Sequence, residues 1–168
     1  MVGLIVLASA LVWSQSDLFD PRLVEQVSVQ AAASRDPVVP GQSFEIHVEV
    51  VPQAGINVYA PGNRDYAAPV VTLEWPADVR TAAVTYPAGE LFVFGESKEP
   101  VRVYRRRFRI RQRVTIPAAA PTARVQALEV AGSLRYQACD DRVCFPVRTI
   151  PFRLALRLAP TATSGSGR

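Results

Sequence analysis

The sequence predicts an all-β protein with the architecture of an immunoglobulin-like β-sandwich. Short segments alternate apolar and polar residues, and this period of two turns one face of a strand toward a core. The 14 prolines and 9 glycines help to interrupt the chain. Turn signals recur roughly every 8 to 15 residues, which leaves room for seven or eight short strands. With 168 residues and 49% apolar content, the chain is long enough to bury one core.

The first 16 residues have the character of a leader rather than of a folded domain. Val2 to Trp13 are almost all apolar, but about 20 such residues are needed to span a bilayer. The run fits the apolar part of a secretory signal, with Ala8-Ser9-Ala10 as a small-x-small cleavage site, although no Lys or Arg precedes Arg22. We expect residues 1–16 to direct export, or to stay attached as an apolar tail that tethers the protein to a membrane.

One domain is expected over residues 17–159, and the alternation of apolar residues predicts its first strands. After a stretch at 18–29 that could hold a helical turn, a first strand is expected near Val27. The residues from Phe44 to Val50 predict a half-buried strand with His47 on its solvent face. Further strands are expected at 56–59, 71–75 and, more weakly, 79–86, with a polar loop at 61–69 and an aromatic-rich patch at 91–95.

The segment 101–116 predicts one long strand with an arginine face. The net charge is +4 and Lys98 is the only lysine, so arginine supplies nearly all the positive charge. We interpret the arginine face as the solvated side of a sheet, with an anion-binding surface as the alternative. No aromatic residues interleave on it and no nucleic-acid motif occurs, so a nucleic-acid partner is not expected. Phe108 and Ile110 fall on the opposite face from Arg105, Arg107, Arg109, Arg111 and Arg113.

The C-terminal third of the chain completes the predicted sandwich. A connector rich in Ala and Pro at 117–122 leads to a strand at 125–138, in which Gly132 is expected to bend the chain or mark a bulge. Alternating leucines at 154–158 predict the last strand. Residues 160–168 are small and polar, and we expect them to form a disordered tail.

The two cysteines of the chain, Cys139 and Cys144, lie close together at the expected tip of a β-hairpin. A disulfide between them would close a loop of about six residues and stabilise the fold by roughly 2 kcal/mol, near the low end for disulfides. A structural crosslink would gain more from a longer loop, whereas neighbouring thiols suit reversible exchange. Asp140 and Asp141 disfavour a thiolate at Cys139 and Arg142 favours one, so these residues leave open which thiol ionises first.

Two other roles for the cysteines stay open at this point. Lone pairs of cysteines in exported proteins generally form structural disulfides, and such a bond could rigidify a loop of a non-catalytic, immunoglobulin-like binding module. A metal site has less support, because the pair and the single distant His47 fall short of four zinc ligands. Neither a metal nor a cofactor is expected, and no catalytic triad, phosphate loop or paired carboxylates stand out.

The segment Tyr136-Gln-Ala-Cys139-Asp-Asp-Arg-Val-Cys144-Phe-Pro146 resembles the cysteine loop of the N-terminal periplasmic domain of the thiol:disulfide interchange protein DsbD. In that family a YQxC…C(Y/F)P segment carries a redox-active pair. The family's cysteine spacing can be one residue longer, and Val147 stands where a second proline often follows. The order of segments is also similar from Leu18 to Leu158, and includes 56–61, 71–76, 90–95 and 103–105. The resemblance implies an immunoglobulin-like sandwich.

The resemblance further implies an exported thiol–disulfide exchange protein, a periplasmic component of a protein-disulfide reductase. In the family, this domain receives electrons from a membrane-embedded partner through a thioredoxin-like domain. Neither is recognised in this sequence, so we expect either a stand-alone version that works with a separate membrane thiol carrier or thioredoxin-like donor, or a fragment of a longer protein. The protein would reduce periplasmic thioredoxin-fold proteins such as disulfide isomerases and cytochrome c maturation factors. We expect it to act as a monomer.

The family also implies roles for individual residues. By position, Cys144 would form the mixed disulfide with partners and Cys139 would resolve it. An aromatic cap loop shields the pair in the family, and here Phe92 or Phe94 would fill that role with Gly95 as a hinge. Ordinary core packing would also explain both phenylalanines. Other residues expected near the pair are Tyr59, Tyr136, Asp140, Asp141, Arg142, Phe145 and Pro146.

Overall fold

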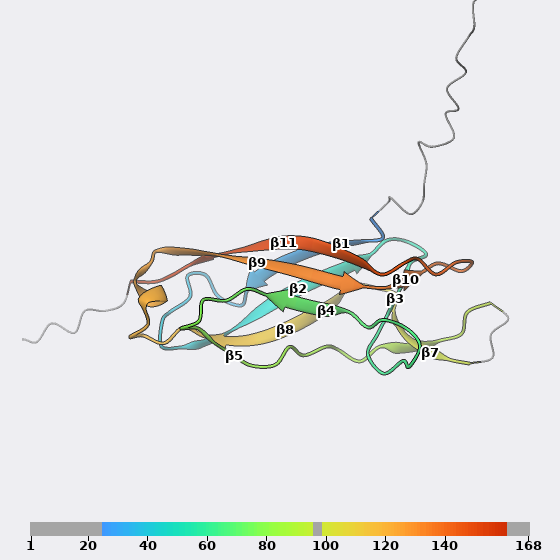
Figure 1. The fold of residues 1–168 in the computed structure, drawn as a ribbon, viewed down its shortest axis with the longest axis horizontal. Coiled ribbons are helices and arrows are strands. Elements are labelled where there is room, and N and C mark those ends of the chain that lie inside the picture. The colour runs from blue at the N-terminus through green and yellow to red at the C-terminus, as the bar shows by residue number, and fades with distance from the viewer. Residues whose placement is uncertain (1–24, 96–98, 161–168) are drawn as a thin grey trace, which may run out of the picture.

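The computed structural model describes residues 25–95 and 99–160, which form antiparallel sheets packed as a β-sandwich (Figure 1). The predicted all-β class is confirmed. No helix in these two ranges is long and apolar enough to cross a membrane. The strands are β1 (Val27–Ala33), β2 (Ser43–Pro52), β3 (Asn57–Tyr59), β4 (Val70–Leu73), β5 (Arg80–Thr81), β6 (Glu90–Phe92), β7 (Val101–Tyr104), β8 (Phe108–Thr115), β9 (Ala127–Tyr136), β10 (Ala138–Cys139) and β11 (Arg148–Arg157), and a 3-10 helix, η2 (Pro121–Arg124), lies between β8 and β9.

The described residues form three sheets. The orders β1-β2-β8-β5 and β11-β9-β4 form the two large layers. The third sheet, β10-β3-β7-β6, consists of short strands. In Figure 1, β10, β3 and β7 lie at one end of the molecule, near the tip of the hairpin that joins β9 to β11, while η2 and β5 lie toward the other end. The fold therefore brings the cysteine hairpin and the short third sheet to the same end.

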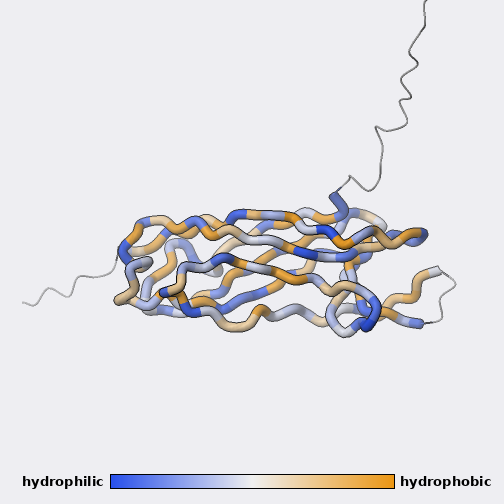
Figure 2. The backbone as a smooth tube through the Cα atoms, viewed as in Figure 1, coloured by the Kyte–Doolittle hydropathy of each residue, from blue (hydrophilic) through white to orange (hydrophobic). Residues whose placement is uncertain are grey.

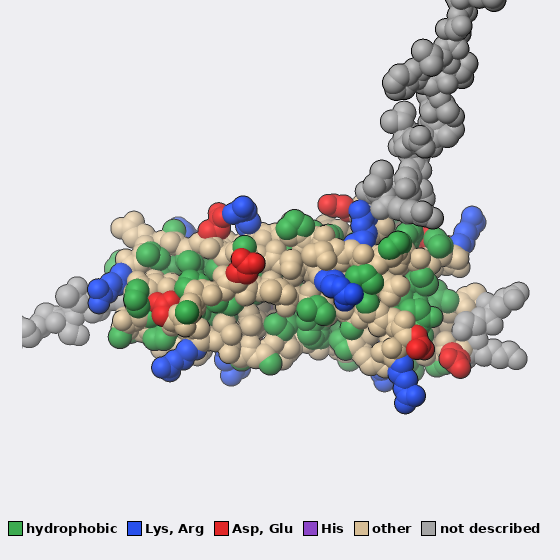
Figure 3. All heavy atoms as spheres, in the orientation of Figure 1, with side chains coloured by type: hydrophobic (Ala, Val, Ile, Leu, Met, Phe, Trp, Pro, Cys, Tyr) green, Lys and Arg blue, Asp and Glu red, His purple; other side chains and the backbone are tan. Residues whose placement is uncertain are grey.

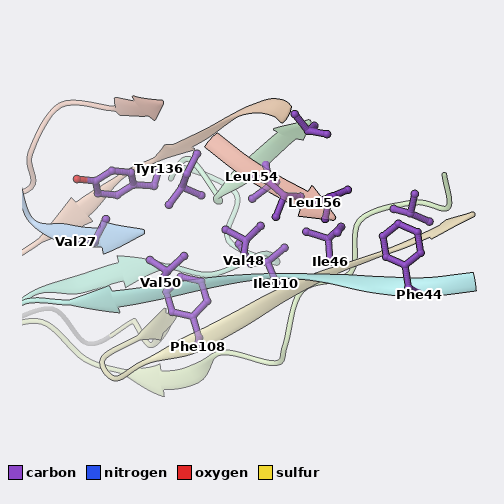
Figure 4. Close-up of a cluster of buried hydrophobic side chains, with 14 of the residues drawn as sticks. Val27, Phe44, Ile46, Val48, Val50, Phe108, Ile110, Tyr136, Leu154 and Leu156 are labelled. Carbon is purple, nitrogen blue, oxygen red and sulfur yellow. The ribbon is translucent and has the colours of Figure 1, made fainter. Parts of the chain in front are cut away.

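The core forms where the apolar faces of the two large layers meet (Figure 4). Along β2 every second residue is buried, from Phe44 to Val50, as the alternation in the sequence predicts. Figure 2 shows the alternating hydropathy along the long strands, and Figure 3 shows charged side chains scattered over the outer surface. Burying each large aliphatic side chain contributes about 1.5 to 3 kcal/mol. The fully buried side chains include Ile46, Val48, Val50, Ile110, Leu134 and Leu154.

The prediction of one continuous strand over 101–116 is wrong. The chain forms β7 and β8 in different sheets, with Arg105 to Arg107 between them. The reason is a change of parity, because Val103 is buried at an odd position whereas Phe108 and Ile110 are buried at even ones. A single flat strand cannot bury both sets on one face. The arginines of β8 do lie on its exposed face, at positions 109, 111 and 113.

The hairpin of β9 and β11 is regular along its whole length. The register runs unbroken from Ala127 opposite Arg157 to Tyr136 opposite Arg148. A bulge, one of the two features expected at Gly132, is therefore absent from this hairpin, and that residue pairs directly with Phe152. A Cβ at this position would overlap the Phe152 ring and lie 2.9 Å from the Leu73 side chain. The absence of a side chain at Gly132 thus leaves room for Phe152 and Leu73, which pack over the strand at this point.

Two other predicted strands are shorter in the structure than the sequence indicates. The strand expected at 79–86 is reduced to β5 and an isolated bridge at Thr85. The strand expected at 71–75 ends at Leu73, and the indole of Trp75 donates a hydrogen bond to Gln112 at 3.1 Å. The leader at 1–16, the start of the domain at 17–24 and the tail at 161–168 lie outside the described residues.

Gly132→Ala is expected to destabilise the domain by about 1 to 3 kcal/mol, the usual cost of overpacking, because the added methyl overlaps the Phe152 ring. Urea unfolding followed by tryptophan fluorescence measures this loss. Combining Gly132→Ala with Phe152→Leu should recover part of it, since the smaller side chain makes room. A variant as stable as the unsubstituted protein would contradict the packing role given to this glycine.

Candidate functional site

A disulfide joins Cys139 and Cys144 at the hairpin tip, with the two Cα atoms 4.0 Å apart. Cys139 ends β10, which pairs with β3 through Ala138 opposite Val58 and Cys139 opposite Asn57. The chain then turns, and the Phe145 N–H donates to the Ala138 carbonyl at 2.8 Å. The predicted hairpin tip is confirmed, and β10 fixes one of its two sulfurs to the third sheet.

Asp140 holds the turn between the cysteines. Its Oδ1 accepts hydrogen bonds from the N–H groups of Arg142 at 2.8 Å and Val143 at 2.7 Å. Those two bonds, chiefly the one from Val143, lower the pKa of the Asp140 carboxyl. The carboxylate form therefore dominates at neutral pH and is the form that accepts both bonds. Asp140 thus shapes the loop, in addition to the electrostatic effect on the thiols expected from the sequence.

The two cysteines differ sharply in exposure. Cys139 is 0% exposed, whereas Cys144 lies on the surface. Cys139 packs in a small cluster with Tyr59 and Val103, separate from the main core. Because thiol–disulfide exchange requires a thiolate to approach a sulfur along an open path, an incoming partner can reach Cys144 and not Cys139.

The hydroxyl of Tyr59 lies between the two sulfurs, 3.1 Å from Cys139 Sγ and 3.3 Å from Cys144 Sγ. A disulfide has no S–H, so the hydroxyl is the donor in these contacts. Desolvation of the Tyr59 side chain, with a smaller effect from Tyr66, raises its pKa well above the ordinary value. The hydroxyl therefore keeps its proton over the physiological pH range and stays a donor toward sulfur.

Tyr66 is a part of this site that the sequence reasoning missed. Its ring stacks on that of Tyr59, with centroids 3.9 Å apart and planes 8° from parallel. It comes from the loop at 61–69, which shows no strand periodicity. Gln137 helps to hold this loop, because its side-chain carbonyl accepts the Ala67 N–H at 3.0 Å.

An open pocket lies beside Cys144, and the aromatic segment after β6 forms part of its wall. Phe94 and Gly95 line this pocket together with Tyr59, Tyr66 and Cys144. The Phe94 ring centroid lies 6.1 Å from that of Tyr59, and Gly95 has φ +46, in the left-handed region that glycine adopts easily. The chain at this point therefore turns without steric strain, immediately beside the ring that faces the sulfurs.

Phe92 does not line this pocket. Its ring packs edge-on against Phe94, with centroids 4.8 Å apart. Arg105 covers the Phe92 ring at 4.4 Å. Both phenylalanines are half-buried and pack against the cluster of Cys139. Phe92 thus supports Phe94 rather than bordering the pocket itself.

The remaining predicted residues line the pocket, belong to the core or are exposed. Asp140, Asp141 and Arg142 line the pocket, and Pro146 is exposed. Tyr136 belongs to the main core, where its hydroxyl donates to Gln26 at 3.0 Å, and Phe145 is also buried there. Further lining residues that the sequence reasoning did not single out are Glu99, Val101 and Val143.

His47 lies far from the cysteines in sequence and on a different sheet. Its Nε2 is 3.2 Å from Glu45 Oε2 on the outer face of β2. Within residues 25–95 and 99–160, no group of three or more His, Cys, Asp or Glu side chains is arranged to hold a metal ion. The geometry of the site is that of a sulfur pair beside a tyrosine hydroxyl.

Comparison with known proteins yields one matching family model, described as the N-terminal part of the thiol:disulfide interchange protein DsbD. It matches residues 24–156. Among solved structures, the N-terminal periplasmic domain of ScsB from Proteus mirabilis matches with a TM-score of 0.54 and 17% sequence identity. The match covers 87% of this chain and 52% of that one, so the chain spans about half the length of the ScsB structure.

A second solved structure is AggA, the major subunit of aggregative adherence fimbriae type I from Escherichia coli. It is 8% identical, covers 82% of this chain and 98% of its own, and has a TM-score of 0.35, too low to support any argument. No curated protein matches the sequence. The ScsB match supports the sandwich fold, and the family match covers both the sandwich and the cysteine hairpin.

Tyr59→Phe is expected to slow alkylation of the reduced protein by iodoacetamide about three- to ten-fold at pH 7. A hydrogen bond to a charged sulfur contributes about 1.5 kcal/mol or more, and its loss reduces the thiolate population. Mass spectrometry of the alkylated protein gives the rate. Tyr136→Phe is the matched control, because it removes a buried hydroxyl that bonds Gln26 instead. Equal rates in both variants would contradict the role given to Tyr59.

Proposed function

The chain belongs to the family of the N-terminal domain of the thiol:disulfide interchange protein DsbD, and we propose that it is an exported carrier of reducing equivalents. The observation that carries the proposal is the unequal exposure of the two sulfurs, one open to a partner and one buried beside a tyrosine hydroxyl. Cys139 and Cys144 would cycle between dithiol and disulfide without a cofactor, in a domain that extends over residues 17–159.

The protein would be reduced through Cys144. A thiolate of the donor attacks Cys144 Sγ, a bond forms between these two sulfurs, and the Cys139–Cys144 bond breaks. Cys139 leaves as a thiolate, 3.1 Å from the Tyr59 hydroxyl that can donate to it. A second thiol of the donor then attacks the donor's own sulfur and frees Cys144. Two electrons have moved from the donor, which is left as a disulfide.

Delivery would run through the same sulfur in reverse. The Cys144 thiolate attacks the disulfide of a client and forms a mixed disulfide, releasing one client thiol. The Cys139 thiolate then attacks Cys144 Sγ, so the client leaves with its second thiol and the disulfide of the hairpin is restored. The turn held by Asp140 supports this step, since it keeps the two cysteines adjacent.

The surface around Cys144 suits a protein partner. Val143 and Val147 flank it on the hairpin, exposed by 53% and 39%. Exposed apolar residues rimmed by polar ones are typical of protein contacts. The clients would be periplasmic thioredoxin-fold proteins of the disulfide isomerase or cytochrome c maturation type. The donor would be a membrane thiol carrier or a thioredoxin-like protein, and the carrier itself would act as a monomer.

A cap would protect the pair between reactions. Phe94 borders the pocket of Cys144, and Gly95 beside it supplies a backbone able to turn. Phe92 would brace this cap through its contact with Phe94. Movement of the segment would widen the approach to Cys144 for a large partner, while the aromatic ring would cover one side of the sulfur between reactions.

A second candidate function is a binding module in which the disulfide only rigidifies the hairpin. The observation in its favour is the turn itself, which Asp140 already holds through two backbone hydrogen bonds. The two functions differ in whether the disulfide is easily reduced and whether Cys144 attacks other disulfides.

Cys139→Ser is expected to accumulate a mixed disulfide with an oxidised thioredoxin-fold disulfide isomerase, because the exposed Cys144 can attack but nothing resolves the product. Cys144→Ser, the matched variant, should form about ten-fold less, since its remaining thiol is buried. Non-reducing electrophoresis measures both. Similar yields from the two variants would contradict the roles assigned to the cysteines.

The reduction potential of the unsubstituted protein separates the two candidate functions. Equilibration in thiol buffers should give a value of about −200 to −270 mV, within the span of thioredoxin-family exchange proteins. A value well below about −300 mV would indicate a structural disulfide and favour the binding module.

Phe94→Ala is expected to speed reduction of the disulfide by dithiothreitol about three- to ten-fold, because the ring beside Cys144 is lost. Quenched alkylation over time gives the rate. Leu91→Ala is the control, since it removes an exposed side chain of β6 outside the pocket. An unchanged rate together with lower stability would assign Phe94 to ordinary core packing.

A further inference from the structure

A groove lined by arginines lies where β7 passes into β8. We call it the arginine groove. Its other wall comes from the chain just before β6, at Pro87 and Ala88, and Glu90 is its single carboxylate. The arginines that line it are Arg105, Arg106, Arg107, Arg109 and Arg111.

The carboxylates of the domain neutralise these charges only in part. Arg111 interacts with Glu45, whose pKa is lowered chiefly by its hydrogen bond to His47 and further by this arginine. Glu49 is shared by Arg107 at 3.6 Å and Arg109 at 3.4 Å. In the part of the chain that the structure describes, Arg106 and Arg111 form no salt bridge. Like charges held close together repel unless an anion comes between them. The groove is therefore best matched by a negatively charged occupant.

The shape of the groove favours an extended occupant. Arg109 and Arg111 lie two residues apart on β8, so their Cα atoms are about 6.7 Å apart along the strand. Such a row matches several carboxylates along a peptide, which arginine can bind with paired hydrogen bonds. The aromatic rings of the groove, Tyr104 and Phe108, stack on each other and are only 5% and 7% exposed. They offer no open face on which a nucleic-acid base could stack.

The groove is connected to the disulfide by a short chain of ring contacts. Arg105 lies 4.4 Å from the centroid of Phe92, and Phe92 packs against Phe94 at 4.8 Å. Phe94 in turn lines the pocket of Cys144. A protein bonded to Cys144 would therefore extend its adjoining surface over the cap segment and reach the groove.

We propose that the arginine groove binds an acidic segment of the protein that exchanges its disulfide with Cys144. The proposal rests on the exchange function above and adds the chemistry by which a partner is selected. The bound carboxylates pair with the row of guanidinium groups, and this pairing holds the partner's sulfur near Cys144 before any covalent bond forms. Partners with an acidic surface beside their cysteines would be preferred over neutral ones.

The test uses two peptides that differ only in charge. Each carries a cysteine blocked as its thionitrobenzoate mixed disulfide, a short Gly-Ser linker, and either four glutamates or four glutamines. In the reduced protein, the Cys144 thiolate attacks the peptide sulfur and expels thionitrobenzoate, whose colour gives the rate. Cys139 then attacks Cys144 Sγ and releases the peptide thiol, so the two electrons of the dithiol reduce one disulfide.

The acidic peptide should react about ten-fold faster than the neutral one at low salt, as expected for electrostatic attraction. The difference should vanish as ionic strength rises from about 0.01 M to about 1 M, since the Debye length falls from about 30 Å to about 3 Å. The double variant Arg106→Glu, Arg111→Glu should lose this preference and keep its rate with the neutral peptide.

The matched control is the double variant Arg80→Glu, Arg124→Glu. It makes the same change in net charge on exposed residues of β5 and η2, toward the end of the sandwich opposite the cysteines. It should retain most of the preference for the acidic peptide. An equal loss in both double variants would mean that overall charge is responsible, and would overturn the proposal.

Three other results of the peptide experiment would each overturn the groove proposal. If both peptides are reduced at the same rate, the groove proposal fails and the exchange function stands. If neither peptide is reduced, the exchange function fails and the groove proposal falls with it. If inorganic phosphate removes the preference while chloride at the same ionic strength does not, the groove is a phosphate site and the proposal is wrong.

Discussion

The pairing of β10 with β3 is the contact on which the site depends. The regular hairpin of β9 and β11 carries the cysteines to one end of the sandwich, but it leaves the tip unattached. The two residue pairs between β10 and β3 attach it. They bring the strand that carries Tyr59 beside Cys139, and β7 on the other side of β3 adds Val103 to the same cluster. The buried environment of one sulfur follows from this small sheet.

Folding and reactivity are carried by different parts of the molecule. The two large layers bury most of the apolar side chains, and the disulfide adds only roughly 2 kcal/mol by closing a loop of about six residues. Breaking that bond is therefore expected to leave the sandwich folded. The third sheet, the aromatic segment after β6 and the hairpin tip lie around the sulfurs, where changes in shape cost little of the total stability.

Alternation of apolar residues was enough to predict β2, β9 and the C-terminal half of β11, because each buries one face against a single core. The first half of β11, from Arg148, was not predicted. It failed at 101–116, where the buried parity changes between Val103 and Phe108 as the chain passes from one sheet to another. Gly132 was misjudged for a related reason, since its role depends on Phe152 and Leu73 from neighbouring strands. Such tertiary contacts leave no local pattern.

The cysteine hairpin could be predicted from its own residues, whereas its surroundings could be predicted only in part. Tyr66 comes from an irregular loop, and its stacking on Tyr59 requires the fold to bring distant segments together. Tyr136 is close to Cys139 in sequence, but the strand directs its side chain into the main core. Distance along the chain is a poor guide in strands, because successive side chains point to opposite faces.

The turn held by Asp140 has a kinetic consequence. With the two cysteines kept adjacent, attack by one sulfur on the other is an intramolecular step at high effective concentration. In the proposed exchange, a covalent adduct with a client would then be short-lived, and its lifetime would be set by the hairpin rather than by the client. Release of the client would not need a third protein, and the carrier would return quickly to its donor.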